Sequence, residues 1–228
     1  MNGYGFTLAG AALMALPSGA LWWPEQRLLT VSDLHLGKSD RAARLDGALL
    51  PPYETEDTLS RLDADIGATR PATVVCLGDS FDDLAAAGAL AEPHALWLAR
   101  LMAGRRWIWV EGNHDPGPLG LGGSHLAELC EEPLTFRHIA LPGAEAEVSG
   151  HYHPKAPLGS GLTRPCFLCD EARLVLPAYG TYTGGLRCDR APLVALMRPG
   201  ALALLLGPRV TPLPMPGAQP PRLATAPS

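Results

Sequence analysis

Four short apolar runs, each ending in a cluster of Asp, Asn or His residues, are the feature that most constrains this 228-residue chain. The runs are rich in Val, Leu, Ile and Trp and are closed by Gly or a polar turn, which is typical of buried strands. They cover residues 28–32, 73–77, 107–110 and 146–149, and the polar clusters follow at 33–35, 78–79, 112–115 and 150–153. Because ligands bind beyond the carboxyl ends of strands in open α/β sheets, we expect the clusters to gather at one edge of one sheet.

Stretches with Leu and Ile at helical spacing, residues 55–66 and 92–102, separate the first three runs. This alternation of strand and helix predicts βαβ units and a mainly parallel sheet. After His153 four more apolar runs are separated by Gly and Pro turns and predict strands of a second sheet, at residues 166–168, 173–176, 193–196 and 201–205. The sequence therefore predicts an α/β fold with two packed mixed sheets flanked by helices.

The two ends of the chain lead to separate expectations. Residues 6–23 are apolar, but no Lys or Arg precedes Arg27, and Pro17-Ser18-Gly19 interrupts the run. This pattern favours a β-hairpin of residues 7–16 and 20–23 over a signal peptide or a membrane span, so we expect a soluble, cytoplasmic protein that binds no membrane. Residues 1–211 are expected to form one domain, and the Pro-, Ala- and Gly-rich residues 212–228 a disordered tail.

The charge balance and the cysteines exclude several classes of protein. With 18 Lys and Arg against 23 Asp and Glu, the net charge of −5 argues against a broad basic surface for nucleic acid, so such contacts must be local or helped by bound cations. Five irregularly spaced cysteines do not form a disulfide framework. Cys166-x-x-Cys169 has no second zinc pair, and we expect reduced thiols.

The polar clusters contain residue types that bind metals. A single D-x-H or G-D pair is common, and a lone His is usually an ordinary polar residue, but an ordered series of such clusters after predicted strands is much harder to produce by chance. Mixed carboxylate, amide and imidazole ligands favour Mn, Fe or Zn over Mg or Ca. The side chains in question are Asp33, His35, Asp79, Asn113, His114, His151 and His153.

Five longer motifs carry a family resemblance, at residues 33–39, 78–81, 112–116, 150–154 and 176–186. The series resembles the calcineurin-like metallophosphoesterase superfamily, and over residues 5–210 it resembles one branch, the ligase-associated DNA damage response endonucleases (PdeM or MPE type). The resemblance implies a four-layer sandwich and two divalent metal ions, with Mn favoured. Two metal ions about 3.5–4 Å apart clamp a phosphate and activate a water.

The resemblance also implies a ligand set. Asp79 would bridge the two ions. The remaining ligands would be Asp33, His35 and His153 at the first site and Asn113 and His151 at the second. A further His ligand is expected between residues 115 and 150. His138, at the end of an apolar run, is favoured over His125, which lies in a Gly-rich stretch.

The resemblance makes His114 the general acid that protonates the leaving oxygen. Asp115 would orient that imidazole, or alternatively cap the turn before Pro116. Asp82 stands where the branch often has His, so it is expected to weaken a substrate contact. Asp83 either bonds into the site or caps a helix.

The basic residues beside the motifs are candidates for holding a nucleic-acid backbone or are simply a solvated surface: Lys38, Arg41, Arg44 and Lys155. The resemblance implies a metal-dependent phosphodiesterase that cuts DNA, as a single-strand or loop endonuclease in repair, with functional links to DNA ligase or helicase. The alternative enzymatic function is a phosphodiesterase or pyrophosphatase that acts on a small nucleotide-like substrate, and the acidic net charge fits this alternative. A non-catalytic scaffold without metal ions is disfavoured, because such a protein should have lost ligands and here the expected positions are filled.

Overall fold

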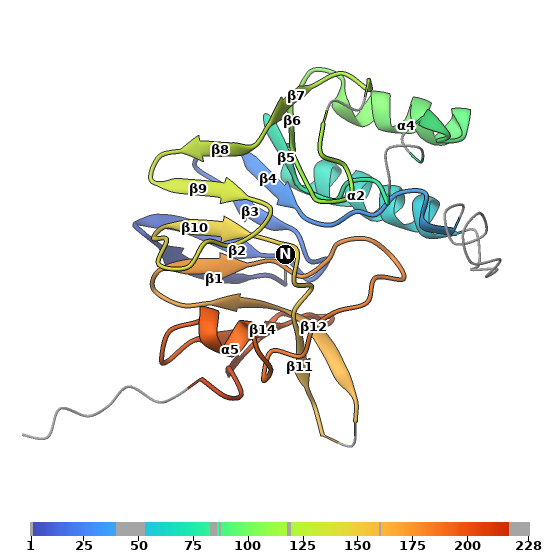
Figure 1. Ribbon diagram of the computed structural model, residues 1–228. Helices are drawn as coiled ribbons and strands as arrows, with labels where there is room; N and C mark the ends of the chain where they lie inside the picture. Colours follow the sequence, from blue (N-terminus) through green and yellow to red (C-terminus); the bar gives the residue numbers. More distant parts are fainter. Residues whose placement is uncertain are drawn as a thin grey trace, which may run out of the picture.

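The computed structural model describes residues 2–39, 53–82, 86, 88–117, 120–159 and 161–218. Its described part consists of two β-sheets packed face to face, with helices on the outer faces (Figure 1). Alternate residues of a central strand face different cores: Val75 packs between the sheets with Phe136, whereas Val74 packs beneath helices with Leu59. A third apolar cluster, which includes Leu193, covers the far side of the second sheet. The expected α/β arrangement of two mixed sheets flanked by helices is confirmed.

The first sheet contains seven described strands in chain order. The first four pair antiparallel and the last four pair parallel. Helix α2 (Glu54–Thr69) precedes β5 and helix α4 (Glu92–Met102) precedes β6, which confirms both expected helices. The strands are β1 (Tyr4–Leu8), β2 (Ala11–Ala15), β3 (Leu21–Trp23), β4 (Leu28–Val31), β5 (Thr73–Leu77), β6 (Arg106–Val110) and β7 (Ser124–Leu126).

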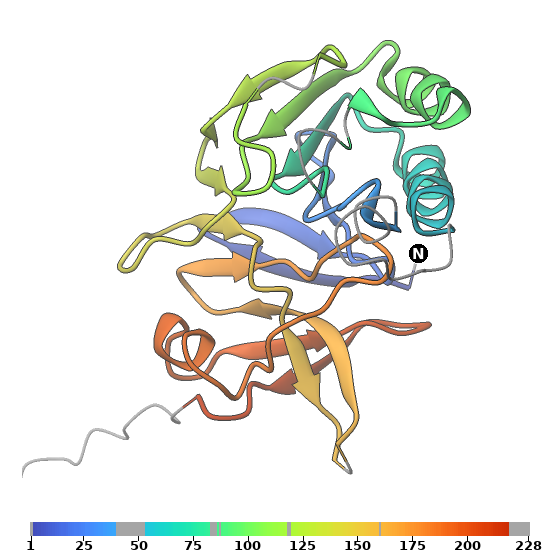
Figure 2. The ribbon, with the colours of Figure 1, turned by 45° about the vertical axis from the view of Figure 1, so that its right-hand side comes forward.

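The second sheet has the order β15-β14-β12-β13-β10-β9-β8 among the described strands, and β11 pairs with β12 in a hairpin that projects from the sheet (Figure 2). Within this sheet, β10 is parallel to both of its neighbours, β9 and β13. The strands are β8 (Glu128–Glu131), β9 (Leu134–Arg137), β10 (Glu147–Ser149), β11 (Lys155–Pro157), β12 (Thr163–Cys169), β13 (Arg173–Val175), β14 (Leu202–Leu205) and β15 (Thr211–Pro214).

The position of β10 corrects one expectation. The clusters after β4, β5 and β6 share an edge of the first sheet, but the fourth cluster follows β10, a strand of the second sheet. The expectation of one edge of one sheet is therefore wrong. All four clusters still meet, because the two sheets pack face to face and their carboxyl-end loops converge (Figure 1).

Three smaller expectations also differ from the structure. Residues 7–16 are not one strand, because Ala9 (φ 49°) and Gly10 (φ 89°) form a turn between β1 and β2. Residues 193–196 form the short helix α5 (Leu193–Leu196) rather than a strand, since a run of four apolar residues fits either state. Residues 212–214, which were expected to belong to a disordered tail, instead lie in β15 (Thr211–Pro214) and pair with β14. Residues 219–228 lie outside the described part.

All five cysteines are free thiols, as expected. Cys166 and Cys169 lie three residues apart on β12 and therefore point to opposite faces of the sheet, into different apolar clusters, so they do not form a joint site. Among the described helices, none combines the length and the apolar character needed to cross a bilayer.

Candidate metal centre

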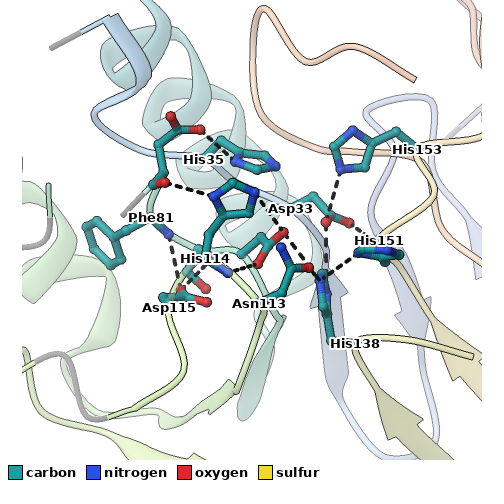
Figure 3. A network of polar contacts seen from close by, with 12 residues as sticks. Asp33, His35, Phe81, Asn113, His114, Asp115, His138, His151 and His153 are labelled. Carbon is teal, nitrogen blue, oxygen red and sulfur yellow. Dashed lines mark hydrogen bonds and ion pairs between the residues drawn. The ribbon is translucent and has the colours of Figure 1, made fainter. Parts of the chain in front are cut away.

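Loops from both sheets bring the motif residues together in one network of polar contacts (Figure 3). The loops after β4 and β5 run side by side, because the backbone N–H of His35 donates to the carbonyl of Asp79 at 2.9 Å. The loop after β10 is held to β9, since Gly150 N–H donates to the carbonyl of His138 at 2.9 Å. The candidate ligands form two neighbouring groups.

The first group consists of Asp33, His35 and His153, whose ligand atoms lie within 4.8 Å of one another. Asp33 is fully buried, and its Oδ1 lies 3.1 Å from Nε2 of His153. His35 Nδ1 donates to Oδ1 of Asp82 at 2.9 Å, whereas its buried Nε2 has no hydrogen-bond partner. A buried nitrogen with a free lone pair beside a carboxylate is suited to a metal ion.

The second group consists of Asp79, His138 and His151, again with ligand atoms within 4.8 Å of one another. His138 Nδ1 donates to the carbonyl of Leu77 at 3.1 Å, so the lone pair of Nε2 faces the group. That Nε2 lies 3.1 Å from Oδ1 of Asn113, 3.2 Å from Nδ1 of His151 and 3.3 Å from Oδ2 of Asp79. Nitrogen and oxygen lone pairs converging in this way favour a shared cation.

The backbone at these ligands is strained. Five of the seven candidate ligands have positive φ angles between 44° and 68°, which are uncommon for residues other than glycine. Such conformations cost about 1–3 kcal/mol each and cluster at functional sites, where the surrounding structure enforces them. The five residues are Asp33, His35, Asp79, His151 and His153.

The electrostatics of the two carboxylates also fit a cation site. Burial alone would raise the pKa of Asp33 and Asp79, but hydrogen bonds and charges from His153 and His138 outweigh it and hold both pKa values below the usual range. Burial lowers the pKa of His138, but Asp79 and Asp33 outweigh that effect and raise it. The site thus keeps two buried anionic carboxylates at neutral pH.

His114 lies between the two groups and the solvent. Its side chain is one-third exposed, and its Nε2 lies 4.0 Å from Oδ2 of Asp79. Nδ1 donates to the backbone carbonyl of Asp82 at 3.0 Å, so this carbonyl orients the ring. The expected orienting bond from Asp115 is replaced by it: Asp115 instead accepts the backbone N–H groups of Ser80 and Phe81, at 2.7 and 3.2 Å.

Asp115 therefore ties the loop after β6 to the loop after β5. Its carboxyl is buried, and this burial, together with the nearby charge of Asp79, raises its pKa to about 6 against the effect of the two backbone donors. As in the turn-capping alternative, Asp115 accepts hydrogen bonds from backbone N–H groups. These groups belong to the neighbouring loop rather than to the turn before Pro116.

The structure adds a contact for one expected residue of the site and shows another that the sequence reasoning missed. Asp82 is 3% exposed and accepts from Nδ1 of His35, so its carboxylate orients this candidate ligand. Ser32 donates to the carboxylate of Asp33 and was overlooked. Its position directly before Asp33 at the end of a strand was the available signal.

Some of the other candidate residues lie at the site, some lie away from it, and some fall outside the described residues. His138 joins the second group, whereas His125 stacks on Trp109 with ring centroids 6.3 Å apart. Lys38 Nζ lies 3.9 Å from Oδ1 of Asp82, close to the first group, and Lys155 Nζ donates to the carbonyl of Thr183 at 3.2 Å. Arg41, Arg44 and Asp83 lie outside the described residues.

The residues present fit two divalent metal ions. Each group offers at least one buried carboxylate and two imidazoles, and Asn113 adds an amide oxygen to the second. The unpartnered Nε2 of His35 supports this fit independently of the grouping. The mixed oxygen and nitrogen donors match first-row transition metals better than Mg or Ca.

This paired site on a two-sheet sandwich defines a metallophosphoesterase. The family described as calcineurin-like phosphoesterase matches residues 26–169, and the chain belongs to this family. It is therefore a metal-dependent phosphoesterase, that is, a hydrolase.

Among solved structures, the chain is similar to the crystal structure of the Pseudomonas putida nuclease MPE. The two share 31% sequence identity with a TM-score of 0.74, over 92% of this chain and 100% of that chain. No curated protein matches the chain. The structural similarity supports the MPE branch inferred from the motifs.

Proposed function

We propose that the protein is a manganese-dependent phosphodiesterase that hydrolyses DNA as a single-strand or loop endonuclease, with a role in repair. The observation that carries this proposal is the pair of Asp and His groups, joined across the two sheets in a chain of the metallophosphoesterase family. The similarity to a nuclease, 31% identical over nearly the whole chain, supports nucleic acid as the substrate.

The metal ions would be held by Asp33, His35 and His153 in one group and by Asp79, Asn113, His138 and His151 in the other. When bound, such a pair neutralises phosphate charge and lowers the pKa of water. We propose that Asp79 lies between the two ions. Its bond with the backbone N–H of His114, 2.9 Å, fixes the carboxylate relative to the loop that carries Asn113.

The role we propose for His114 is proton donation to the departing sugar oxygen. Its Nδ1–H is fixed by the carbonyl of Asp82, so Nε2 is the atom that faces the site and the solvent. Lys38 and the other basic residues near the motifs, Arg41, Arg44 and Lys155, would hold the phosphate backbone on either side.

The test is cleavage of a single-stranded oligonucleotide, its duplex form and a small chromogenic phosphodiester by the Mn-loaded protein. We expect internal cuts in the single strand and a loss of about 10²–10⁴-fold in kcat for His114→Ala. His94→Ala, on helix α4, serves as the matched control. Cleavage of the small ester alone would instead support the alternative substrate class, a small nucleotide-like phosphodiester.

The repair role is tested in cells that lack the protein. We expect sensitivity to DNA damage that the wild-type chain restores and His114→Ala does not, together with co-purification with a DNA ligase or helicase. We also propose that the protein acts in the cytoplasm, which fractionation of the cells would examine. Equal survival of the deletion strain and its parent would count against the repair role.

A further inference from the structure

A groove of about 400 Å³ opens beside the second ligand group and has no part in the chemistry described above. Asn113 and His138 line it, together with other residues of the loops after β6, β7 and β9 and with Glu128 of β8 and Arg137 of β9. His114 does not line the groove. The groove therefore adjoins the second ligand group on the side of Asn113 and His138.

The outer wall of the groove is apolar and exposed. Ile139 and Leu141 follow β9 and are 41% and 50% exposed, although they border a catalytic centre. Exposed aliphatic side chains that line a concavity next to a polar site commonly mark a contact for a ligand. The volume lies in the range of small-molecule pockets, about 300–1,000 Å³, and exceeds what a phosphate alone requires.

The wall is also fixed in place by buried charges. The backbone N–H of Leu141 donates to Oε1 of Glu147 at 2.9 Å, and its carbonyl accepts from Nη1 of Arg173 at 3.2 Å. Glu147 and Arg173 are almost completely buried and pair with each other at 3.1 Å. The groove is therefore shaped before a ligand arrives, which lowers the entropic cost of binding.

The charges in the groove disfavour a second phosphate. Its carboxylates are Glu111 and Glu128, and its cation, Arg137, is neutralised by Glu128 at 3.1 Å and by Glu147 at 3.5 Å. Carboxylates repel phosphate but accept hydrogen bonds from the exocyclic amino groups of bases. The groove thus suits a flat, uncharged group with an amino edge.

We propose that this groove binds the nucleoside that stays attached to the scissile phosphate, with its base against Ile139 and Leu141 and its amino edge toward Glu111 or Glu128. This inference rests on the proposed function. It assigns the groove to the retained nucleoside because His114, the proposed donor to the leaving oxygen, lies outside it.

The test compares diesters that share the p-nitrophenolate leaving group: the 3′ and 5′ isomers of deoxycytidine p-nitrophenyl phosphate, and methyl p-nitrophenyl phosphate. For the wild type we expect kcat/KM to be about tenfold or more higher for at least one nucleoside ester than for the methyl ester, mainly because KM is lower. In Ile139→Ser/Leu141→Ser this preference should fall to about twofold or less. The control Leu96→Ser replaces an exposed leucine on α4 and should keep the wild-type preference.

A second readout does not depend on turnover. Calorimetric titration of the Mn-loaded protein with deoxycytidine monophosphate and with methyl phosphate should show tighter binding of the nucleotide, and the double variant should lose that difference. Equal kcat/KM for nucleoside and methyl esters in the wild type, or an unchanged preference in the double variant, would overturn the groove assignment alone. Inactivity toward all three esters and DNA would overturn the proposed function as well.

Discussion

At the scale of single residues, partners outside the ligand groups orient three imidazoles of the site, those of His35, His114 and His138. Asp82 does this twice, since its carboxylate accepts from His35 and its backbone carbonyl accepts from His114. Only the first contact uses the side chain. A substitution at Asp82 therefore separates the positioning of a ligand from the positioning of the proposed acid.

Asp82→Ala should weaken metal binding by about 10–100-fold, because His35 loses the acceptor that fixes its ring. The substitution keeps the backbone carbonyl at position 82, which accepts from His114. Calorimetric titration with Mn measures the change, and Asp63→Ala, on helix α2 and paired with Arg100, provides the control. An unchanged Mn affinity in Asp82→Ala would contradict the role assigned to this carboxylate.

At the scale of elements, close approaches between strand ends and loops set the position of the ligands. Gly78, directly after β5, has a φ of +74°, and a Cβ there would lie 2.1 Å from Nδ1 of His138. Thus the loop of the first sheet touches the ligand of the second sheet through a glycine. The approach lets Leu77 accept the Nδ1–H of His138 at 3.1 Å.

Gly78→Ala should therefore cost more than the backbone strain alone. We expect at least about 3 kcal/mol from positive φ together with steric overlap, and reduced Mn affinity. Gly104→Ala has nearly the same φ, +73°, with nothing within 4 Å of the added Cβ, and should cost only about 1 kcal/mol. Urea denaturation of both variants compares them, and equal losses would show that the contact with His138 is not tight.

Several hydrogen bonds anchor the loop at residues 176–186 to helix α2, among them the bond from Thr181 N–H to Oγ1 of Thr58 at 3.1 Å and the bond of one buried tyrosine. Tyr179 is fully buried; its hydroxyl donates to Oδ2 of Asp65 at 2.9 Å, and its backbone N–H donates to the carbonyl of Ser32 at 2.7 Å. The same loop approaches Asp33 through Gly180, whose N–H donates to the Asp33 carbonyl at 3.0 Å. Helix α2 thus supports the strand end that carries Asp33.

Tyr179→Phe leaves the half-buried Asp65 carboxyl without this donor and should lower the free energy of unfolding by about 1–3 kcal/mol. The matched substitution Tyr182→Phe changes a tyrosine that is 44% exposed and should have an effect within about 0.5 kcal/mol of zero. Thermal or urea unfolding measures both. Similar effects of the two substitutions would argue that the Asp65 bond contributes little.

At the scale of the whole molecule, the metal centre joins the two sheets. Asp33 and His35 follow a strand of the first sheet, whereas His153 follows β10 of the second, and all three belong to one ligand group. A metal ion held by this group would connect the sheets directly. Its binding energy would therefore contribute to the stability of the sandwich.

Mn should raise the melting temperature, and a chelator should reverse the rise. At a free metal concentration 100 times Kd, one site contributes about 2.7 kcal/mol to the free energy of unfolding. His153→Ala removes the contribution of the second sheet to the first group and should show a smaller shift in calorimetry. A melting temperature that is independent of Mn in the wild type would contradict the link between the sheets.

The sequence by itself determined the chemistry of the centre and most of the elements that carry it. Short runs rich in Val, Leu, Ile and Trp predicted β4, β5 and β6, and Leu and Ile at helical spacing predicted α2 and α4. The Asp, Asn and His residues after the apolar runs, together with the family resemblance, indicated the candidate ligands. Local pattern was insufficient for residues 193–196, because a short apolar run is compatible with helix or strand.

Only the tertiary structure decided which sheet supplies each ligand, which partner orients each imidazole, and where the groove lies. These depend on contacts between residues far apart in the chain, such as β10 with β9 and β13, Asp82 with His35, and Leu141 with Arg173. Such pairings follow from sheet register and from packing between layers, which no local pattern of residues encodes.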